Sequence, residues 1–73
     1  MPKLPRISGR EAVQAFEKAG WEVARQRGSH VVLIKPGSLY TLPIPLHRVS
    51  GLGLLGDQIR KAGLTIEEFT DLL

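Results

Sequence analysis

Apolar residues recur at helical spacing near the beginning of the chain, between two signals that mark the ends of a helix. Ser8 is followed three residues later by Glu11, a pair typical of a capping box at a helix N-terminus. Gly20 comes directly after the apolar stripe, and glycine commonly ends helices. The stripe itself consists of Ala12, Val13, Phe16 and Ala19. This pattern predicts an amphipathic helix that buries one face.

The middle of the chain has the pattern of three short strands separated by turns. We expect strands over residues 21–26, 30–35 and 39–44, with turns at 27–29 and 36–38. The second segment is nearly all apolar and rich in β-branched residues, so it is predicted to be the central strand. Prolines in the third segment cannot donate to a sheet, which predicts an edge strand. Turns this short force antiparallel pairing.

The last third of the chain has a second helical stripe followed by another capping box. Gly63 is expected to end this helix, and Thr65 with Glu68 predicts either a short last helix or a bent continuation. The stripe consists of Leu54, Leu55, Ile59 and Ala62. The predicted fold class is therefore α+β, in the order helix, three-stranded antiparallel sheet, helix. We expect one domain over residues 1–73, with the helices on one face of the sheet and the other face free.

Composition narrows the class of protein without identifying a function. The chain has no cysteine, which excludes disulfides and thiolate metal sites and fits a reducing cytoplasm. Residues 1–6 lack the apolar core of a signal peptide, and no apolar run is long enough to span a membrane. We therefore expect a cytoplasmic protein without a membrane partner.

The charge is distributed unevenly around a modest net value of +3. Residues 1–50 hold eight basic and three acidic residues, whereas residues 51–73 hold two basic and four acidic ones. No acidic residue occurs between Glu22 and Asp57, so the middle segment is purely cationic and could meet nucleic acid. Charge alone favours the plainer interpretation of a solvated basic face.

The tripeptide Gly28-Ser29-His30 is the candidate for chemistry, because it lies between a basic strand and an apolar one. Histidine can both accept and donate a proton near neutral pH. Arg25 and Arg27 alternate onto one face of their strand and could hold a phosphate beside the turn. From the pattern alone, a histidine that is satisfied by a backbone carbonyl is the better explanation of His30.

Six short motifs run through almost the whole chain, at residues 8–11, 20–22, 25–30, 35–37, 43–47 and 62–69. In their order and spacing they together resemble the HicA (YcfA-like) toxins of bacterial toxin–antitoxin pairs. The resemblance implies a fold like the double-stranded-RNA-binding domain, an mRNA-cleaving activity and a HicB-like antitoxin as protein partner. It also implies that His30 is the functional histidine, which places the catalytic interpretation ahead of the structural one.

The remaining site predictions follow from this framework. His47 is either a second catalytic group or, as we favour, a loop residue that positions backbone or contacts phosphate. Two histidines without a nearby carboxylate make a poor metal site, so no metal or cofactor is expected. Residues 48–52 hold a single cation where similar proteins have a longer, lysine-bearing stretch, which predicts weaker RNA binding. The predicted RNA-binding residues are Arg25, Arg27, Gly28, Ser29, Lys35, His47 and Arg48.

Three functions remain open from the sequence. The first is a metal-independent endoribonuclease toxin with His30 as its proton-transfer group, and the alternatives are a non-catalytic RNA-binding module and an inactive relic that binds only an antitoxin. Two aromatic residues have ambiguous roles, since aromatic side chains serve both small cores and base stacking. We assign Trp21 to the core and leave Tyr40 open between the two.

Overall fold

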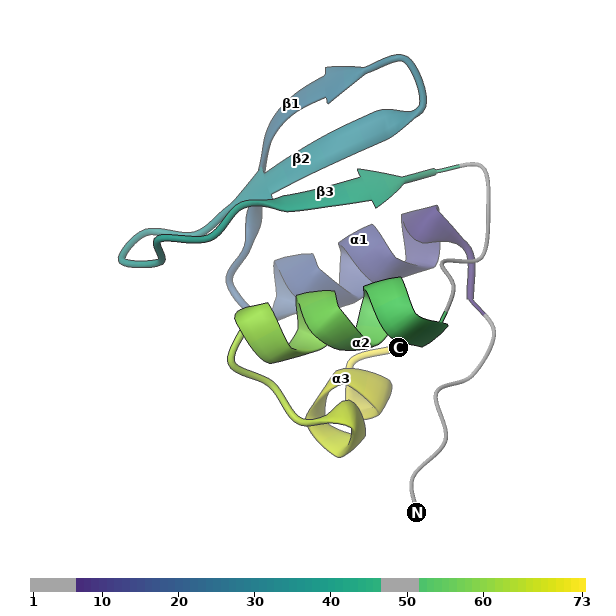
Figure 1. Ribbon diagram of the computed structural model, residues 1–73, viewed down its shortest axis with the longest axis vertical. Helices are drawn as coiled ribbons and strands as arrows, with labels where there is room; N and C mark the ends of the chain where they lie inside the picture. The colour runs from purple at the N-terminus through teal and green to yellow at the C-terminus, as the bar shows by residue number, and fades with distance from the viewer. Residues whose placement is uncertain (1–6, 47–51) are drawn as a thin grey trace.

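A computed structural model of the protein describes residues 7–46 and 52–73. A three-stranded antiparallel sheet in the order β1-β2-β3 lies on one side, and the helices lie together on the other (Figure 1). This confirms the predicted α+β class with the arrangement of a double-stranded-RNA-binding-domain-like fold. In chain order the elements are α1 (Gly9–Lys18), β1 (Glu22–Arg27), β2 (His30–Ile34), β3 (Leu42–Pro45), α2 (Leu52–Lys61) and α3 (Ile66–Asp71).

Both predicted capping boxes form as the sequence indicates. At the start of α1, the Ser8 hydroxyl accepts from the Glu11 backbone N–H at 3.2 Å, and the Glu11 carboxylate accepts from the Ser8 N–H at 3.0 Å. Thr65 and Glu68 make the same reciprocal pair at the start of α3, so the chain ends in a separate short helix. The helix stops are also confirmed, since Gly20 and Gly63 have φ angles of 100° and 78°, a region that favours glycine.

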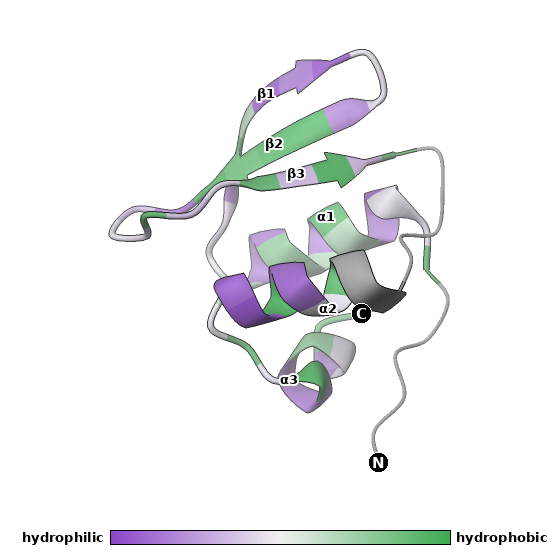
Figure 2. Cartoon of the chain, in the orientation of Figure 1, coloured by the Kyte–Doolittle hydropathy of each residue, from purple (hydrophilic) through white to green (hydrophobic). Residues whose placement is uncertain are grey.

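The core lies between the helices and the inner face of the sheet. Val31 and Leu33 of β2 are buried on this face, and β2 is the central strand as predicted. The rings of Phe16 in α1 and Phe69 in α3 pack with their centroids 4.9 Å apart. Trp21 is only 2% exposed, which confirms its assignment to the core. Figure 2 shows that the central strand β2 is largely hydrophobic, whereas the edge strand β1 is largely hydrophilic.

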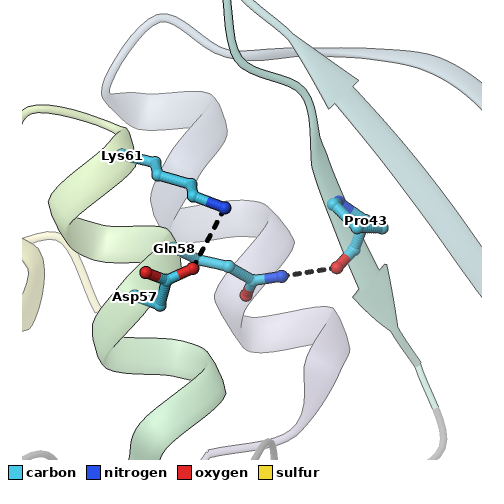
Figure 3. Close-up of polar contacts among 4 residues, drawn as sticks. All are labelled: Pro43, Asp57, Gln58 and Lys61. Carbon is cyan, nitrogen blue, oxygen red and sulfur yellow. Dashed lines mark hydrogen bonds and ion pairs between the residues drawn. The ribbon is translucent and has the colours of Figure 1, made fainter.

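One buried polar contact joins α2 to the edge of the sheet. Gln58 is 3% exposed, and its side-chain amide donates to the backbone carbonyl of Pro43 in β3 (Figure 3). One turn further along the same helix, Lys61 pairs with Asp57 at 3.1 Å on the solvent side. The amide contact fixes the edge strand, whereas an exposed ion pair of this kind contributes little to stability.

All three strands differ from the predicted ranges 21–26, 30–35 and 39–44 by one to three residues at one or both ends. Leu39 and Tyr40 were expected to begin β3 but lie in the loop before it, because Ser38 accepts the Tyr40 N–H through its side chain and so diverts it from the sheet. Arg27 was expected in the turn but belongs to β1, which leaves a two-residue turn at Gly28-Ser29. Within the described ranges, no helix is both long and apolar enough to cross a membrane.

Candidate nucleic-acid interface

The candidate residues lie on the β1–β2 hairpin, and its register decides which of them meet. Arg27 is paired directly with His30, and Arg25 with Val32. Directly opposite residues of an antiparallel pair project to the same face. Val31 and Leu33 point into the core, so His30 and Val32 must project to the opposite, helix-free face. The two arginines therefore share the open face of the sheet with His30. The sequence had predicted both on one face of their strand, flanking the turn that carries His30.

A β-bulge in β1 makes this arrangement possible. The register shifts between Val23 and Arg25, so Ala24 is an extra residue in its strand. Before the shift, Val23 is paired with the core residue Leu33 and projects to the inner face. Without the shift, Arg25 would lie opposite Val31 and would face the helices as well. The bulge thus places the cations beside His30, and the sequence signalled it only as an imperfect alternation.

The turn before His30 is fixed by its backbone rather than by crowding. Gly28 has a φ angle of 57°, and a Cβ atom added there would meet nothing within 4 Å. The carbonyl of Gly28 accepts from the Gln26 side chain at 3.1 Å, and the carbonyl of Ser29 accepts from the Leu46 N–H at 2.7 Å. Ser29 is a turn residue, as expected, and its carbonyl ties the hairpin to the chain that leaves β3.

Gly9, in the first turn of α1, packs against the end of β3 next to the turn before His30. Sequence reasoning missed this contact. A Cβ atom at this position would lie 1.8 Å from the Pro45 carbonyl oxygen and 2.8 Å from the Leu46 Cα. The first turn of α1 therefore rests directly on the end of β3, where Pro45 is the register partner of His30. The available signal was a glycine inside a predicted helix, where this residue type is unfavourable.

The His30 side chain is exposed and is flanked by Arg27 on one neighbouring strand and Pro45 on the other. Within residues 7–46 and 52–73 its ring makes no hydrogen bond, so the alternative of an imidazole satisfied by a backbone carbonyl does not occur there. In the same ranges no three His, Cys, Asp or Glu side chains gather as metal ligands would. An exposed imidazole beside two guanidiniums can exchange protons with a bound phosphodiester.

The other predicted RNA-binding residues do not join this group. Lys35 follows the far end of β2, and at about 3.3 Å per residue it is about 16 Å from His30 along the strand. It would therefore have to contact a different phosphate. His47 and Arg48 lie outside the described residues. The geometry thus brings together one histidine and two arginines, with Gly28 and Ser29 as the turn that holds them.

Comparison with known proteins adds a family to this geometry. A family model described as HicA toxin of bacterial toxin-antitoxin matches residues 9–64. This range contains the whole sheet, the Gly28-Ser29 turn and the first two helices. No curated protein matches the chain.

Proposed function

Because the chain belongs to the HicA toxin family of bacterial toxin–antitoxin systems, we propose that it is a metal-independent endoribonuclease that cleaves mRNA in the cytoplasm. The observation that carries the proposal is the pairing of Arg27 with His30 on the open face of the sheet, next to Arg25. None of the described helices covers this face, so an extended RNA strand can lie across it (Figure 1).

The chemistry follows from RNA itself, which carries its nucleophile in the 2′-hydroxyl. His30 accepts the proton of this hydroxyl as its oxygen attacks the adjacent phosphorus, and the bond from phosphorus to the 5′ oxygen breaks. A proton returned to that oxygen leaves one fragment with a 2′,3′-cyclic phosphate and the other with a 5′-hydroxyl. Arg25 and Arg27 hold the phosphate and stabilise the charge that develops on it. General acid–base help of this kind is worth about 10²–10⁴ in rate.

The test is cleavage of a labelled mRNA by His30→Ala and His30→Gln variants. Both are expected to stay folded by circular dichroism, because the side chain is exposed, and to lose cleavage by at least about 100-fold. Arg60→Ala, which removes an exposed cation from α2, is the matched control and should cleave normally. A folded His30→Ala variant that cleaves at the wild-type rate would refute the catalytic role. RNA binding without cleavage by the wild type would favour the RNA-binding module instead.

The protein partner in this proposal is a HicB-like antitoxin. A catalytic group on an open cationic face has no internal means of being switched off, and an acidic partner is steered toward such a face. We expect the antitoxin to cover His30 or its immediate neighbours and to exclude RNA. RNA binding by the preformed complex, with a map of its interface, tests this. Unchanged RNA access, with the antitoxin on the acidic surface of α3, would show that masking is the wrong mechanism.

A further inference from the structure

The loop between β2 and β3 presents the most exposed apolar side chains of the described residues. Leu39 is 100% exposed and Tyr40 is 53% exposed. They border an open pocket of about 450 Å³, which we call the loop pocket. Its wall also includes Trp21, Lys35, Lys61 and Ala62. A single exposed leucine is ordinary, but an exposed leucine and tyrosine beside an apolar pocket are typical of a binding surface.

The loop is held in this conformation by its own backbone. Gly37 has a φ angle of 86°, the Ser38 N–H donates to the Lys35 carbonyl at 3.0 Å, and the Tyr40 N–H donates to the Ser38 hydroxyl at 3.2 Å. These bonds carry the chain through the turn while leaving Leu39 without cover. A partner that contacts Leu39 would therefore meet a loop that is already ordered, which lowers the entropic cost of binding.

The charges beside the loop pocket indicate the kind of partner. Lys35 and Lys61 both line it, and the Lys61 ammonium lies 5.9 Å from the centre of the Tyr40 ring. Lys61 pairs with the Asp57 carboxylate at 3.1 Å, through side chains that are 44% exposed. Such a pair exchanges readily for another, so an incoming carboxylate can take its place. The complementary segment is apolar at its centre and acidic at its edges.

Two features favour a protein segment over RNA as the occupant. An aliphatic side chain such as Leu39 offers nothing to a phosphate, whereas contact with another apolar side chain removes its exposed surface from water. Lys61 already lies over the Tyr40 ring, which leaves less of it for a stacked base. The loop pocket also lies at the opposite end of β2 from His30, so its occupant need not share the RNA site.

We propose that the loop pocket is a second docking site for the antitoxin, occupied by a segment with an apolar side chain flanked by carboxylates. The apolar side chain packs against Leu39 and Tyr40, and the carboxylates meet Lys35 and Lys61. The identity of the partner rests on the proposed function, but the site rests on the exposure and charge described above. The toxin is then held at two separate places, one that blocks RNA and one that only contributes affinity.

The test is the affinity of Leu39→Asp for the antitoxin encoded with this toxin, measured by calorimetry. Aspartate removes the anchor and repels an acidic partner, so the affinity should fall at least tenfold. The matched control is Leu73→Asp, which makes the same change at a leucine that is 43% exposed and outside the loop pocket. Its affinity should stay within twofold of the wild type. RNA cleavage by free Leu39→Asp should also be unchanged, because this residue is outside the proposed active site.

The outcomes separate this proposal from the proposed function. If Leu39→Asp binds the antitoxin as the wild type does, or if the antitoxin does not bind at all, the docking site is refuted, whatever the RNA assays show. If Leu39→Asp loses RNA binding while keeping its affinity for the antitoxin, the loop pocket belongs to the RNA. If the wild type does not cleave RNA but Leu39→Asp still weakens antitoxin binding, the docking site stands and the enzymatic proposal fails.

Discussion

Replacing Gly9 with alanine is expected to destabilise this protein, although the same exchange inside a helix usually stabilises it by about 0.5–1 kcal/mol. The added methyl group would lie 1.8 Å from the Pro45 carbonyl oxygen, 2.7 Å from its carbon and 2.8 Å from the Leu46 Cα. Carbon atoms normally approach to about 3.5 Å. Its three nearest neighbours are all backbone atoms, so no rotation of a side chain relieves these contacts. Restoring normal distances requires α1 and β3 to separate by about 1.5 Å.

Forced overpacking of this kind costs about 1–3 kcal/mol, which exceeds any gain in helix propensity. For a chain of 73 residues, each kcal/mol lowers the melting temperature by about 4–8 °C. The displacement also strains the bond from the Leu46 N–H to the Ser29 carbonyl, 2.7 Å long, which holds the turn before His30. Gly9→Ala should therefore lose RNA cleavage beyond the fraction that is unfolded.

The assay is urea unfolding followed by the fluorescence of Trp21, the single tryptophan and a buried one. The matched variant is Gly56→Ala in α2, where an added Cβ meets no described atom within 4 Å. It should raise the free energy of unfolding by about 0.5–1 kcal/mol. The same substitution is thus expected to act with opposite signs at the two glycines. Equal stabilisation at both would show that α1 and β3 are not in direct contact in solution.

Three further predictions test the interface and the fold. The double variant Arg25→Ala, Arg27→Ala should weaken binding to all RNA sequences, and the slope of log affinity against log salt concentration should become shallower by about one to two units. Arg60→Ala should leave this slope unchanged. An unaltered slope in the double variant would show that neither arginine contacts the RNA. RNA cleavage should survive EDTA, and complete loss that is restored by magnesium or zinc would overturn the metal-independent mechanism. Thr65→Ala should cost about 1 kcal/mol in unfolding free energy by removing the N-cap of α3, with Thr65→Ser restoring most of it; an unchanged melting temperature for Thr65→Ala would mean that α3 does not contribute to global stability.

The sequence was sufficient where structure depends on local signals. Both capping boxes, the glycines that end α1 and α2, and the central position of β2 depend on a few adjacent residues and were predicted correctly. The start of β3 was not, because Leu39 has an apolar side chain suited to a strand, whereas the hydrogen bond from the Tyr40 N–H to Ser38 keeps the chain in a loop. A bond between a side chain and the backbone leaves no trace in hydrophobic periodicity.

The sequence indicated which residues form the candidate site, but not the contacts that hold those residues in place. The Gly-Ser-His motif identified His30, and alternation along the strand placed Arg25 and Arg27 together. The contact of Gly9 with Pro45 joins residues far apart in the chain, so no local pattern could reveal it. The sequence grouped Lys35 with the arginines only because of its charge. Distance along the strand decides which cations can reach one phosphate, and Lys35 follows the far end of β2.

The bulge at Ala24 decides which face of the hairpin carries the two arginines, and composition alone does not determine this. A strand has two faces and a period of two, so one extra residue exchanges the faces for everything that follows it unless a bulge absorbs that residue. If β1 paired regularly through Ala24, the composition and net charge would be unchanged, yet Arg25 and Arg27 would turn toward the helices and Gln26 toward solvent. Deleting Ala24 would instead leave Arg25 opposite Val32 and keep both arginines on the open face. Hairpins that carry the same arginines can therefore present opposite surfaces, and the register of the pairing is as informative as the identity of the residues.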